Sequence, residues 1–268
     1  MIERHKASVK RACRLFGLSR TVFAYQPKKK VEDPFIKQEL LALVEENRTH
    51  GFWKLYTRLR NDGFLWNNKR VYRLYRELRL NKRKRPKKRL PSRKKLALVQ
   101  PGQTNMCWSL DFMSDALMNG RRFRTVNIID DFNREALGIR AGFSLPAERV
   151  TEFLDEIAGV RGYPCELRVD NGPENISSVM SNWAAINDVT IKFIQPGKPA
   201  QNGYIERFNR TYREEVLDMN LFYDIDHVQA ITDEWLIKYN SKRPHESLGN
   251  LTPLGFSEKL RMPTEVVH

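Results

Sequence analysis

The stretch Cys107-Trp108-Ser109-Leu110-Asp111-Phe112-Met113 is the part of this 268-residue chain that decides its fold. Its mostly apolar residues predict a short strand, and Asp111 lies within that strand. From about residue 106 onward, the sequence changes from basic helical patterns to strands and helices in succession. We therefore begin with this strand and work outward in both directions.

The residues after this strand predict an α/β domain. Further strands are expected at residues 123–129, 136–141, 167–170 and 190–194, and helices at 146–158, up to about 186, and 200–216. The helix at 146–158 has an apolar face made of Val150, Phe153, Leu154 and Ile157. Three adjacent strands followed by alternating helices and strands predict a mixed five-stranded sheet flanked by helices.

Three carboxylates lie at informative places in this pattern. Asp111 is on the first strand and Asp170 ends the fourth. Glu206 is in the helix beyond the fifth strand, with 35 residues between it and Asp170. Converging carboxylates repel one another unless cations lie between them, and hard oxygen ligands suit Mg²⁺. Two such ions can activate the attacking oxygen and stabilise the leaving oxygen in an in-line phosphoryl displacement. We expect these three residues to be catalytic and metal-binding, with two Mg²⁺ ions or, alternatively, Mn²⁺.

Basic residues near Glu206 are candidates for DNA contact. Arg213 comes seven residues after Glu206, about two helical turns, so it shares that helix face within roughly 20°. It is expected to hold a DNA phosphate beside the metal ions. Lys198 and Arg207 are further candidates whose placement the sequence defines less sharply.

The charge of the chain is divided between its two parts. The net charge is +15, but residues 1–100 hold 29 Lys+Arg and 8 Asp+Glu, a net of +21. The remainder holds 47−29=18 basic and 32−8=24 acidic residues, a net of −6. This division favours a polyanion-binding part joined to a different domain. Nucleic acid is favoured over a membrane, because the basic part is not a single amphipathic helix.

A helical DNA-binding domain is predicted at residues 34–80. Residues 36–46, the segment from Phe52 to Leu59, and the segment from Val71 to Leu78 each repeat apolar residues at helical spacing. Asn67 or Asn68 is a suitable N-cap for the third helix. The outward positions of that helix are basic, as a recognition helix requires for phosphate contact. The predicted DNA-binding residues are Lys69, Arg70, Arg73, Arg76 and Arg79.

Two other basic segments flank this unit. Residues 1–25 resemble a short helix-turn-helix, with Val9, Cys13 and Phe16 on one face and Ser19 as the cap of the second helix. DNA contact and simple packing both remain open for it. Residues 81–100 are predicted to be a basic linker, because 10 of the 15 residues at 81–95 are basic and prolines interrupt them. Phosphate contact is favoured for this linker over a merely solvated tether.

Several classes of protein are excluded or disfavoured. No apolar run reaches the roughly 20 residues of a membrane span, and the N-terminus lacks the apolar region of a secretory signal. Three scattered cysteines form no disulfide framework and no zinc spacing. No nucleophile cluster of a covalent recombinase and no phosphate-cradling Gly-rich loop is recognisable. We expect a cytoplasmic, nucleoid-associated protein with no membrane partner.

Three segments resemble the catalytic segments of retroviral-integrase-like transposases: Trp108-Ser109-Leu110-Asp111-Phe112, Val169-Asp170-Asn171-Gly172-Pro173-Glu174 and Gln201-Asn202-Gly203-Tyr204-Ile205-Glu206-Arg207-Phe208-Asn209-Arg210. The segment Tyr239-Asn240-Ser241-Lys242-Arg243-Pro244-His245-Glu246-Ser247-Leu248 resembles the tail of bacterial insertion-sequence enzymes. The basic helices at 36–80 look like the integrase-associated helix-turn-helix of that group. The chain thus resembles the downstream product of insertion elements with two overlapping reading frames, the "IS-three" family.

This resemblance implies a ribonuclease-H-like core at residues 101–260, including a C-terminal helical tail. It also implies Mg²⁺-dependent 3′ cleavage and strand transfer at inverted terminal repeats, with a DDE triad matched by Asp111, Asp170 and Glu206. Arg213 matches a basic position after the glutamate of the triad. The chain lacks the His/Cys zinc module of retroviral integrases. The expected partners are double-stranded terminal-repeat and target DNA, further copies of the chain on that DNA, and the upstream-frame product.

Alternative interpretations remain for several residues. Asp130 and Asp131 are rival carboxylates, but they fit an ordinary turn, so metal contact is less favoured for them. Metal contact is equally disfavoured for Asp115. Glu174 fits the N-terminus of a helix, so metal contact is the less favoured reading. Asn171 and Gly172 are expected to shape the turn at Asp170. Trp108 is expected in the core rather than on DNA, and His245 is either a phosphate contact or a buried hydrogen-bonding group.

Alternatives also remain for the function. A DNA-binding regulator, or an inactive partial transposase that needs the upstream-frame product, is the principal alternative to an active transposase. A two-metal nuclease outside transposition is weaker, because it leaves the tail and the basic helices unexplained.

Overall fold

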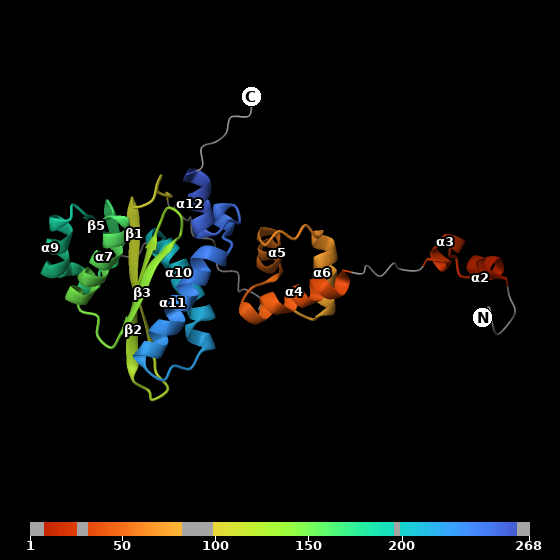
Figure 1. Ribbon diagram of the computed structural model, residues 1–268, viewed down its shortest axis with the longest axis horizontal. Helices are drawn as coiled ribbons and strands as arrows, with labels where there is room; N and C mark the ends of the chain where they lie inside the picture. The colour runs from red at the N-terminus through yellow and green to blue at the C-terminus, as the bar shows by residue number, and fades with distance from the viewer. Residues whose placement is uncertain (1–7, 26–31, 82–98, 196–198, 262–268) are drawn as a thin grey trace, which may run out of the picture.

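The computed structural model describes residues 8–25, 32–81, 99–195 and 199–261 (Figure 1). The N-terminal helices are α2 (Val9–Leu15), α3 (Arg20–Phe23), α4 (Asp33–Glu46), α5 (Phe52–Asn61) and α6 (Asn68–Glu77). The sheet domain contains β1 (Cys107–Ala116), β2 (Arg122–Asp130), β3 (Ala136–Gly142), α7 (Ala147–Arg161), β4 (Glu166–Val169), α8 (Pro173–Ile176), α9 (Ser178–Ile186) and β5 (Thr190–Phe193). It continues with η1 (Pro199–Asn202), α10 (Gly203–Glu215), η2 (Leu217–Met219), α11 (Ile225–Lys242), η3 (Glu246–Leu248) and α12 (Pro253–Arg261). Among the described helices, none has the length and hydropathy that would let it cross a bilayer.

The five strands form one mixed sheet in the order β3-β2-β1-β4-β5. β1 pairs antiparallel with β2, and β2 with β3, whereas β1, β4 and β5 run parallel. The α/β class, the mixed five-stranded sheet and the preceding helical region predicted from the sequence are confirmed. β1 extends three residues beyond the predicted strand, to Ala116, because its hairpin with β2 continues as far as the pair Ala116–Arg122.

Helices cover both faces of the sheet (Figure 1). On one face, Trp108, Leu110 and Val126 of the sheet pack with Leu154 of α7 and Trp183 of α9. On the other face, Phe123, Ile129 and Ile139 pack with Phe208 and Tyr212 of α10 and Tyr239 of α11. α10 therefore lies directly over β1 and β2, and this position matters for the site described below.

Helices α4, α5 and α6 form a unit with an apolar core of its own, hereafter the three-helix unit. Ile36, Leu40, Leu55, Leu59 and Leu74 are all buried in it. Asn67 caps α6, because its side-chain oxygen accepts a hydrogen bond from the backbone N–H of Lys69 at 2.9 Å. One of the two cap positions left open by the sequence is thus selected.

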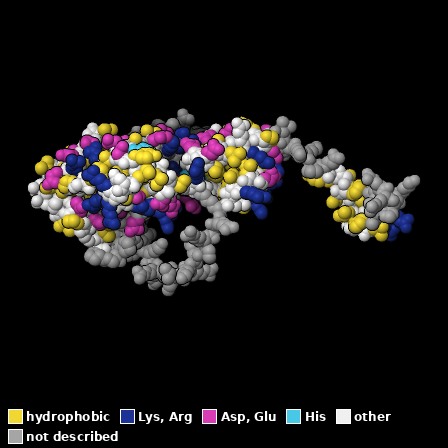
Figure 2. Space-filling view, turned by 90° about the horizontal axis from the view of Figure 1, so that it is seen from below, with side chains coloured by type: hydrophobic (Ala, Val, Ile, Leu, Met, Phe, Trp, Pro, Cys, Tyr) yellow, Lys and Arg dark blue, Asp and Glu magenta, His cyan; other side chains and the backbone are white. Residues whose placement is uncertain are grey.

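The pair α2–α3 encloses little apolar surface. Ser19 caps α3 through the backbone N–H of Val22, as predicted. Of the predicted apolar face, however, only Cys13 is buried, while Phe16 is 62% exposed. The pair lies apart from the rest of the described chain, and hydrophobic side chains gather on its surface (Figures 1 and 2). Two short helices contain too few residues to enclose their own apolar side chains, which the sequence pattern alone does not reveal.

Candidate active site

The register of the parallel strands brings Asp111 and Asp170 to the same edge of the sheet. Ser109 of β1 is opposite Arg168 of β4. Continuing two residues along each strand reaches Asp111, which lies within β1, and Asp170, which directly follows β4, so the two residues are neighbours at the same level. The sequence prediction required these strands to be neighbours, and they are.

Helix α10 brings Glu206 to this edge through a hydrogen-bonded pair of amides. Asn209 lies one turn after Glu206, and its Nδ2 donates to Oδ2 of Asp111 at 2.8 Å. Asn127, which faces Asp111 across the β1–β2 ladder, donates its own Nδ2 to Oδ1 of Asn209 at 2.7 Å. Both asparagines are buried. The chain of amides fixes α10 to the strand that carries Asp111.

The turn after β4 holds the second carboxylate. Oδ1 of Asp170 accepts hydrogen bonds from the backbone N–H of Gly172 at 3.0 Å and from Nδ2 of Asn175 at 2.7 Å. A Cβ on Gly172 would lie 3.0 Å from that same oxygen, so any side chain there would displace it. Asn171 anchors the turn to the adjacent segment by donating to the carbonyl of Ile194 at 3.0 Å.

The ionisation of Asp111 depends on its surroundings. Burial raises the pKa of Asp111 from its ordinary 3.8 to about 6, and the charges of Asp170 and Glu206 add to this effect. Hydrogen bonds from the backbone N–H of Phe112 and from Asn209 act in the opposite direction. Glu206 is exposed and forms no hydrogen bond or ion pair with another described residue.

The donor set is suitable for a hard divalent cation. Each carboxylate offers about four lone-pair positions, so the hydrogen bonds to Asp111 and Asp170 leave room for a ligand. As the side chains stand, no three His, Cys, Asp or Glu residues in the described part of the chain are gathered tightly enough to form a metal centre. The suitability of this site for a divalent cation therefore rests on the oxygen ligands that the three acids offer and on their positions on neighbouring elements.

The rival carboxylates have structural partners. Asp131 accepts from Oγ of Ser109 at 2.7 Å and pairs with Arg168, which joins the β2–β3 turn to β1 and β4. Asp130 accepts from the backbone N–H groups of Asn105 and Phe132, both at 2.9 Å. Both acids are fully buried. Their contacts account for them without a metal ion, as a turn role predicts.

Glu174 and Asp115 are engaged by arginines. Glu174 pairs with Arg124, whose guanidinium outweighs the effect of burial and lowers the pKa of this carboxyl. Arg124 also lies over the ring of Phe112 at 4.5 Å. Asp115 accepts from Nη1 of Arg213 at 3.2 Å. These contacts favour a structural role for both acids over metal contact.

Comparison with known proteins assigns the chain to a family. Models described as an integrase core domain match residues 101–199 and 187–253, and one described as an HTH-like domain matches residues 30–89. The chain is 42% identical to the 31.7 kDa protein of insertion element IS407 from Burkholderia multivorans, over 97% of this chain and 94% of that protein. It is 36% identical to the 39.2 kDa protein of IS476 from Xanthomonas euvesicatoria, over 97% of this chain and 75% of that protein. The chain belongs to the IS-three family of insertion-element transposases.

Two further similarities are consistent with this assignment. A protein from Escherichia coli K12 described as a transposase for insertion sequence IS150 is 24% identical over 85% of this chain and 84% of that protein. One chain of a simian T-cell lymphotropic virus intasome, solved in complex with a PP2A regulatory subunit, superimposes with a TM-score of 0.52 at 16% identity, over 84% of this chain and 76% of that chain. The latter likeness shows a shared ribonuclease-H-like fold. The protein is a DNA transposase, and the alternative, a DNA-binding regulator or an inactive partial transposase, is not favoured.

The structure divides the predicted DNA-binding residues of the transposase into two groups. Arg70 is only 14% exposed and pairs with Glu32 and Asp33, and Arg73 pairs with Asp33 and Glu77. Hydrogen bonds from Arg73 and Arg70 together outweigh the opposing effect of burial and lower the pKa of Asp33. Lys69, Arg76 and Arg79 are exposed and form no ion pair with another described residue. The helical pattern shows outward positions but not which of them face an acidic neighbour on α4.

The basic residues around α10 are also placed differently from one another. Arg213 is tied to the far end of β1, where its guanidinium donates to the carbonyl of Ser114 at 2.8 Å as well as to Asp115. Arg207 is exposed. Lys198 lies outside the described residues. The structure thus places Arg213 on the same helix as Glu206 but in contact with its own acidic partner.

Two residues left open by the sequence lie in the interior. Trp108 is fully buried, as predicted, and its ring N–H donates to Asn105 at 3.1 Å. The ring of His245 packs edge-on against Tyr239 at 5.1 Å, and burial lowers the pKa of His245 to about 3. A neutral imidazole in this position favours the buried alternative over a phosphate contact.

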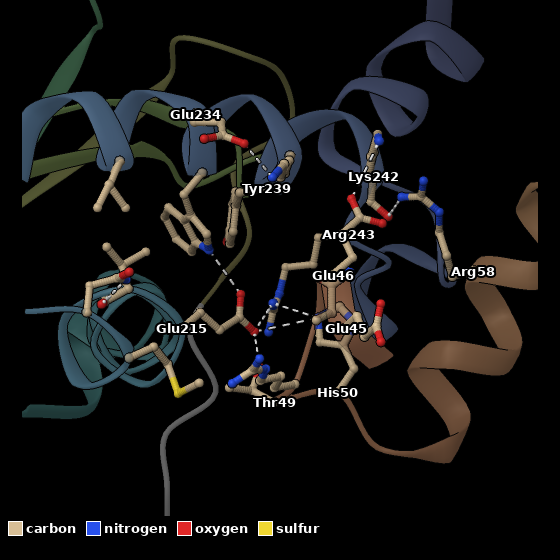
Figure 3. Close-up of a pocket in the computed structure, with 18 residues that line it drawn as sticks. Glu45, Glu46, Thr49, His50, Arg58, Glu215, Glu234, Tyr239, Lys242 and Arg243 are labelled. Atoms are coloured by element: carbon tan, nitrogen blue, oxygen red, sulfur yellow. Dashed lines mark hydrogen bonds and ion pairs between the residues drawn. The ribbon is translucent and has the colours of Figure 1, made fainter. Parts of the chain in front are cut away.

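Sequence reasoning missed a polar cluster at the other end of α10. A cavity of about 410 Å³ lies between the three-helix unit and helices α10 and α11 (Figure 3). At this cavity, Glu215 of α10 pairs with Arg243, lies 3.5 Å from Nε2 of His50, and accepts from Thr49 at 2.8 Å. Nothing in the sequence links residues 49 and 215, which are 166 positions apart. Asn127 and Asn209 were likewise missed. For Asn209 a signal exists, because residues three apart in a helix, such as Glu206 and Asn209, lie on the same face.

Proposed function

We propose that the transposase cuts and joins the ends of its insertion element by metal-dependent in-line phosphoryl displacement, with Asp111, Asp170 and Glu206 as the DDE triad. The observation that carries this proposal is the common edge of the sheet. β1 and β4 bring the two aspartates to one level, and the hydrogen bond from Asn209 to Asp111 holds the helix that bears Glu206 over the same strand. Carboxylates carried by three neighbouring elements are the ligand type that a pair of divalent cations prefers.

The residues around the triad have distinct tasks in this proposal. The N–H of Phe112 and the amide of Asn209 orient Asp111, while the N–H of Gly172 and the amide of Asn175 orient Asp170. Such supporting contacts fix the direction in which each carboxylate presents its free lone pairs. Two Mg²⁺ or Mn²⁺ ions, when bound, would activate the attacking oxygen and stabilise the leaving oxygen.

Recognition of DNA is assigned mainly to the three-helix unit. We infer that Lys69, Arg76 and Arg79 contact phosphates of the terminal repeats, because their charges are exposed and free of acidic partners among the described residues. Arg70 and Arg73 contribute by holding α6 against α4. Arg207, which is exposed, is the candidate for phosphates nearer the triad. Arg213 pairs with Asp115, so it and Lys198 stay sequence-based candidates. Transposition joins two ends, so we expect at least two copies of the chain on paired ends.

The test is cleavage and joining of plasmid DNA that carries the flanking element ends, in Mg²⁺, in Mn²⁺ and in EDTA. The wild type is compared with Asp170→Asn and Glu206→Gln, and with Glu214→Gln as a control, since Glu214 is an exposed residue of the same helix. Metal-dependent products that both active-site substitutions abolish would support the proposal. Products that persist in both would overturn the triad.

A second arm distinguishes an incomplete enzyme from a different function. If the chain binds the element ends but yields no product, the upstream-frame product is added, both separately and as a fusion. Products that appear only then would show that the upstream-frame product is a required partner. Continued absence of products would overturn the proposed activity.

A further inference from the structure

The three-helix unit and the sheet domain touch through a polar interface. From the loop between α4 and α5, Oγ1 of Thr49 donates to Glu215 at 2.8 Å, and Nε2 of His50 lies 3.5 Å from the same carboxylate oxygen (Figure 3). Arg58 of α5 donates to the carbonyl of Lys242, at the end of α11, at 3.0 Å. These contacts connect the three-helix unit directly to the sheet domain, independently of the chain segment that joins the two.

Helix α11 completes the surroundings of Glu215. The ring N–H of Trp235 donates to Oε2 at 3.1 Å, while Arg243 pairs with Oε1 and also lies 3.1 Å from Nε2 of His50. The side chains of Glu215, His50 and Arg243 are 12%, 6% and 9% exposed. Glu215 and Arg243 therefore depend on each other, because a buried charge without its partner is strongly unfavourable, and His50 contacts both.

Ionisation of Glu215 is favoured in spite of burial. Burial alone would raise its pKa, but the hydrogen bond from His50 and the charge of Arg243 outweigh it and hold the pKa well below the ordinary value. Burial and the charge of Arg243 lower the pKa of His50, so its imidazole is neutral at pH 7. The cluster is consequently one carboxylate held by one guanidinium and neutral donors, and it persists across the physiological pH range.

Glu215 lies on the same helix as Glu206. Nine residues of α-helix span about 13 Å and about two and a half turns, so the two side chains point to opposite sides of α10. One side of this helix faces the triad, where Asn209 holds it to β1. The other side carries the residue to which the three-helix unit is attached. α10 thus connects the expected DNA-recognition surface to the expected site of cleavage.

We propose that Glu215 is a positioning residue that determines which phosphodiester is cut, by fixing the three-helix unit at a constant distance from the triad. This inference rests on the function proposed above. A DNA duplex is stiff over the length of such a complex and rises 3.4 Å per base pair. A constant distance between α6 and the triad therefore selects one phosphodiester, and a shift of a few ångströms presents its neighbour instead.

The experiment maps the cut at nucleotide resolution. A labelled duplex with one element end is incubated with the full chain in Mg²⁺, together with the upstream-frame product if the wild type requires it, and the new 3′ ends are resolved on a sequencing gel. Two variants disturb the interface from opposite sides: Glu215→Gln, and the double substitution Thr49→Val with His50→Gln, which lies outside the apolar core of the three-helix unit. Glu214→Gln is the matched control, because Glu214 is the adjacent residue of α10 and its side chain is 59% exposed.

We expect a single cut position in the wild type and in the control. In both interface variants, the cuts are expected to spread over neighbouring phosphodiesters, and the rate at the original position to fall by up to about a hundredfold, the effect of a misplacement of about 1 Å. Binding of the duplex, measured in EDTA, is expected to stay within about twofold of the wild type, since the exposed cations of α6 are unchanged.

Other outcomes would overturn the inference without affecting the proposed activity. A unique cut at the original position in both variants, at the wild-type rate or at a uniformly lower rate, would show that the interface contributes stability or turnover but not position. The same conclusion would follow if Glu215→Gln failed to fold while the loop variant cut as the wild type does. Failure of the proposed function is distinguishable, because the wild type itself would then yield no metal-dependent 3′ ends.

Discussion

Glu206 and Glu215 are two glutamates of one helix with opposite surroundings. Glu206 is exposed and has no hydrogen-bonding or ionic partner among the described residues, whereas Glu215 is nearly buried and is held by Arg243, His50, Thr49 and Trp235. A carboxylate that is already held by a guanidinium and by neutral donors is less available to a metal ion. The comparison teaches that the tertiary partners of an acidic residue, more than its place in a helix, decide between a structural and a catalytic role.

The same distinction applies to the cations of α6. Arg70 and Arg73 are held by Asp33 and its neighbours, while Arg76 projects from the same helix without an acidic partner among the described residues. Held cations stabilise the three-helix unit, and free cations remain available for phosphates. Each prediction below tests this division between held and free charges.

The largest effect is expected from the two carboxylates of the proposed triad, Asp170 and Glu206, which form no ion pair with a described residue. Asp170→Asn or Glu206→Gln should lower the rate of metal-dependent cleavage on the order of 10⁴-fold, as for other residues that act as one catalytic unit. The melting temperature of each variant should stay near that of the wild type, because neither substitution removes a buried ion pair. Cleavage assays and thermal denaturation on the same samples provide the check, and a Glu206→Gln variant with near-normal cleavage would contradict the comparison.

Loss of the held carboxylate should instead affect stability. Glu215→Ala leaves Arg243 and His50 without their partner and should lower the free energy of unfolding by about 3–5 kcal/mol. The control Glu214→Ala, at an exposed neighbour, should change it by less than about 0.5 kcal/mol. Denaturant unfolding measures both values, and equal effects of the two substitutions would refute the assigned role of Glu215.

The pH dependence of this effect has a definite sign. The pKa of Glu215 is lower in the folded protein than in the unfolded chain, so its contribution is present above about pH 4.5 and is lost as the pH falls toward the folded value. The difference in unfolding free energy between the wild type and Glu215→Ala should therefore be constant from pH 6 to 8. It should become smaller below about pH 4.5.

A smaller effect of opposite sign is expected at Asp111. Its pKa is raised from 3.8 to about 6, so the folded protein loses stability as the pH rises from about 4 to about 6, and the ionised group remains unfavourable above that range. Asp111→Asn should therefore stabilise the metal-free protein at pH 8 by about 1–3 kcal/mol. Unfolding in EDTA at pH 8 and at pH 4 checks this, and a variant that is less stable than the wild type at pH 8 would contradict it.

The smallest effect concerns single cations of α6. Arg76→Ala should reduce the slope of the logarithm of DNA affinity against the logarithm of salt concentration by about one, as for the loss of one phosphate contact. Arg70→Ala should leave that slope nearly unchanged, because Arg70 is engaged by Glu32 and Asp33. Fluorescence anisotropy over a salt series measures both slopes. A larger change for Arg70→Ala than for Arg76→Ala would reverse the division between held and free cations.

Much of the fold was predictable because its signals are local. The apolar periodicities placed the strands and helices of the sheet domain to within a few residues, and the Asn before α6 indicated its cap. Three motifs around Asp111, Asp170 and Glu206 led to the proposed triad, because each is a contiguous stretch of sequence. The strand order then brought the two aspartates together, as the prediction required.

Other features depend on contacts between distant segments and have no local signal. The sequence by itself determined the order of the elements, the division of charge and the candidate carboxylates, because hydrophobic periodicity and motif spacing are properties of neighbouring residues. Only the tertiary structure decided that Asp131 supports a turn through Ser109, that Arg70 is held by Asp33, and that Glu215 meets His50 across an interface. The physical reason is that the energy of a charge is set by its partners and its exposure to water, and folding brings those partners from anywhere in the chain.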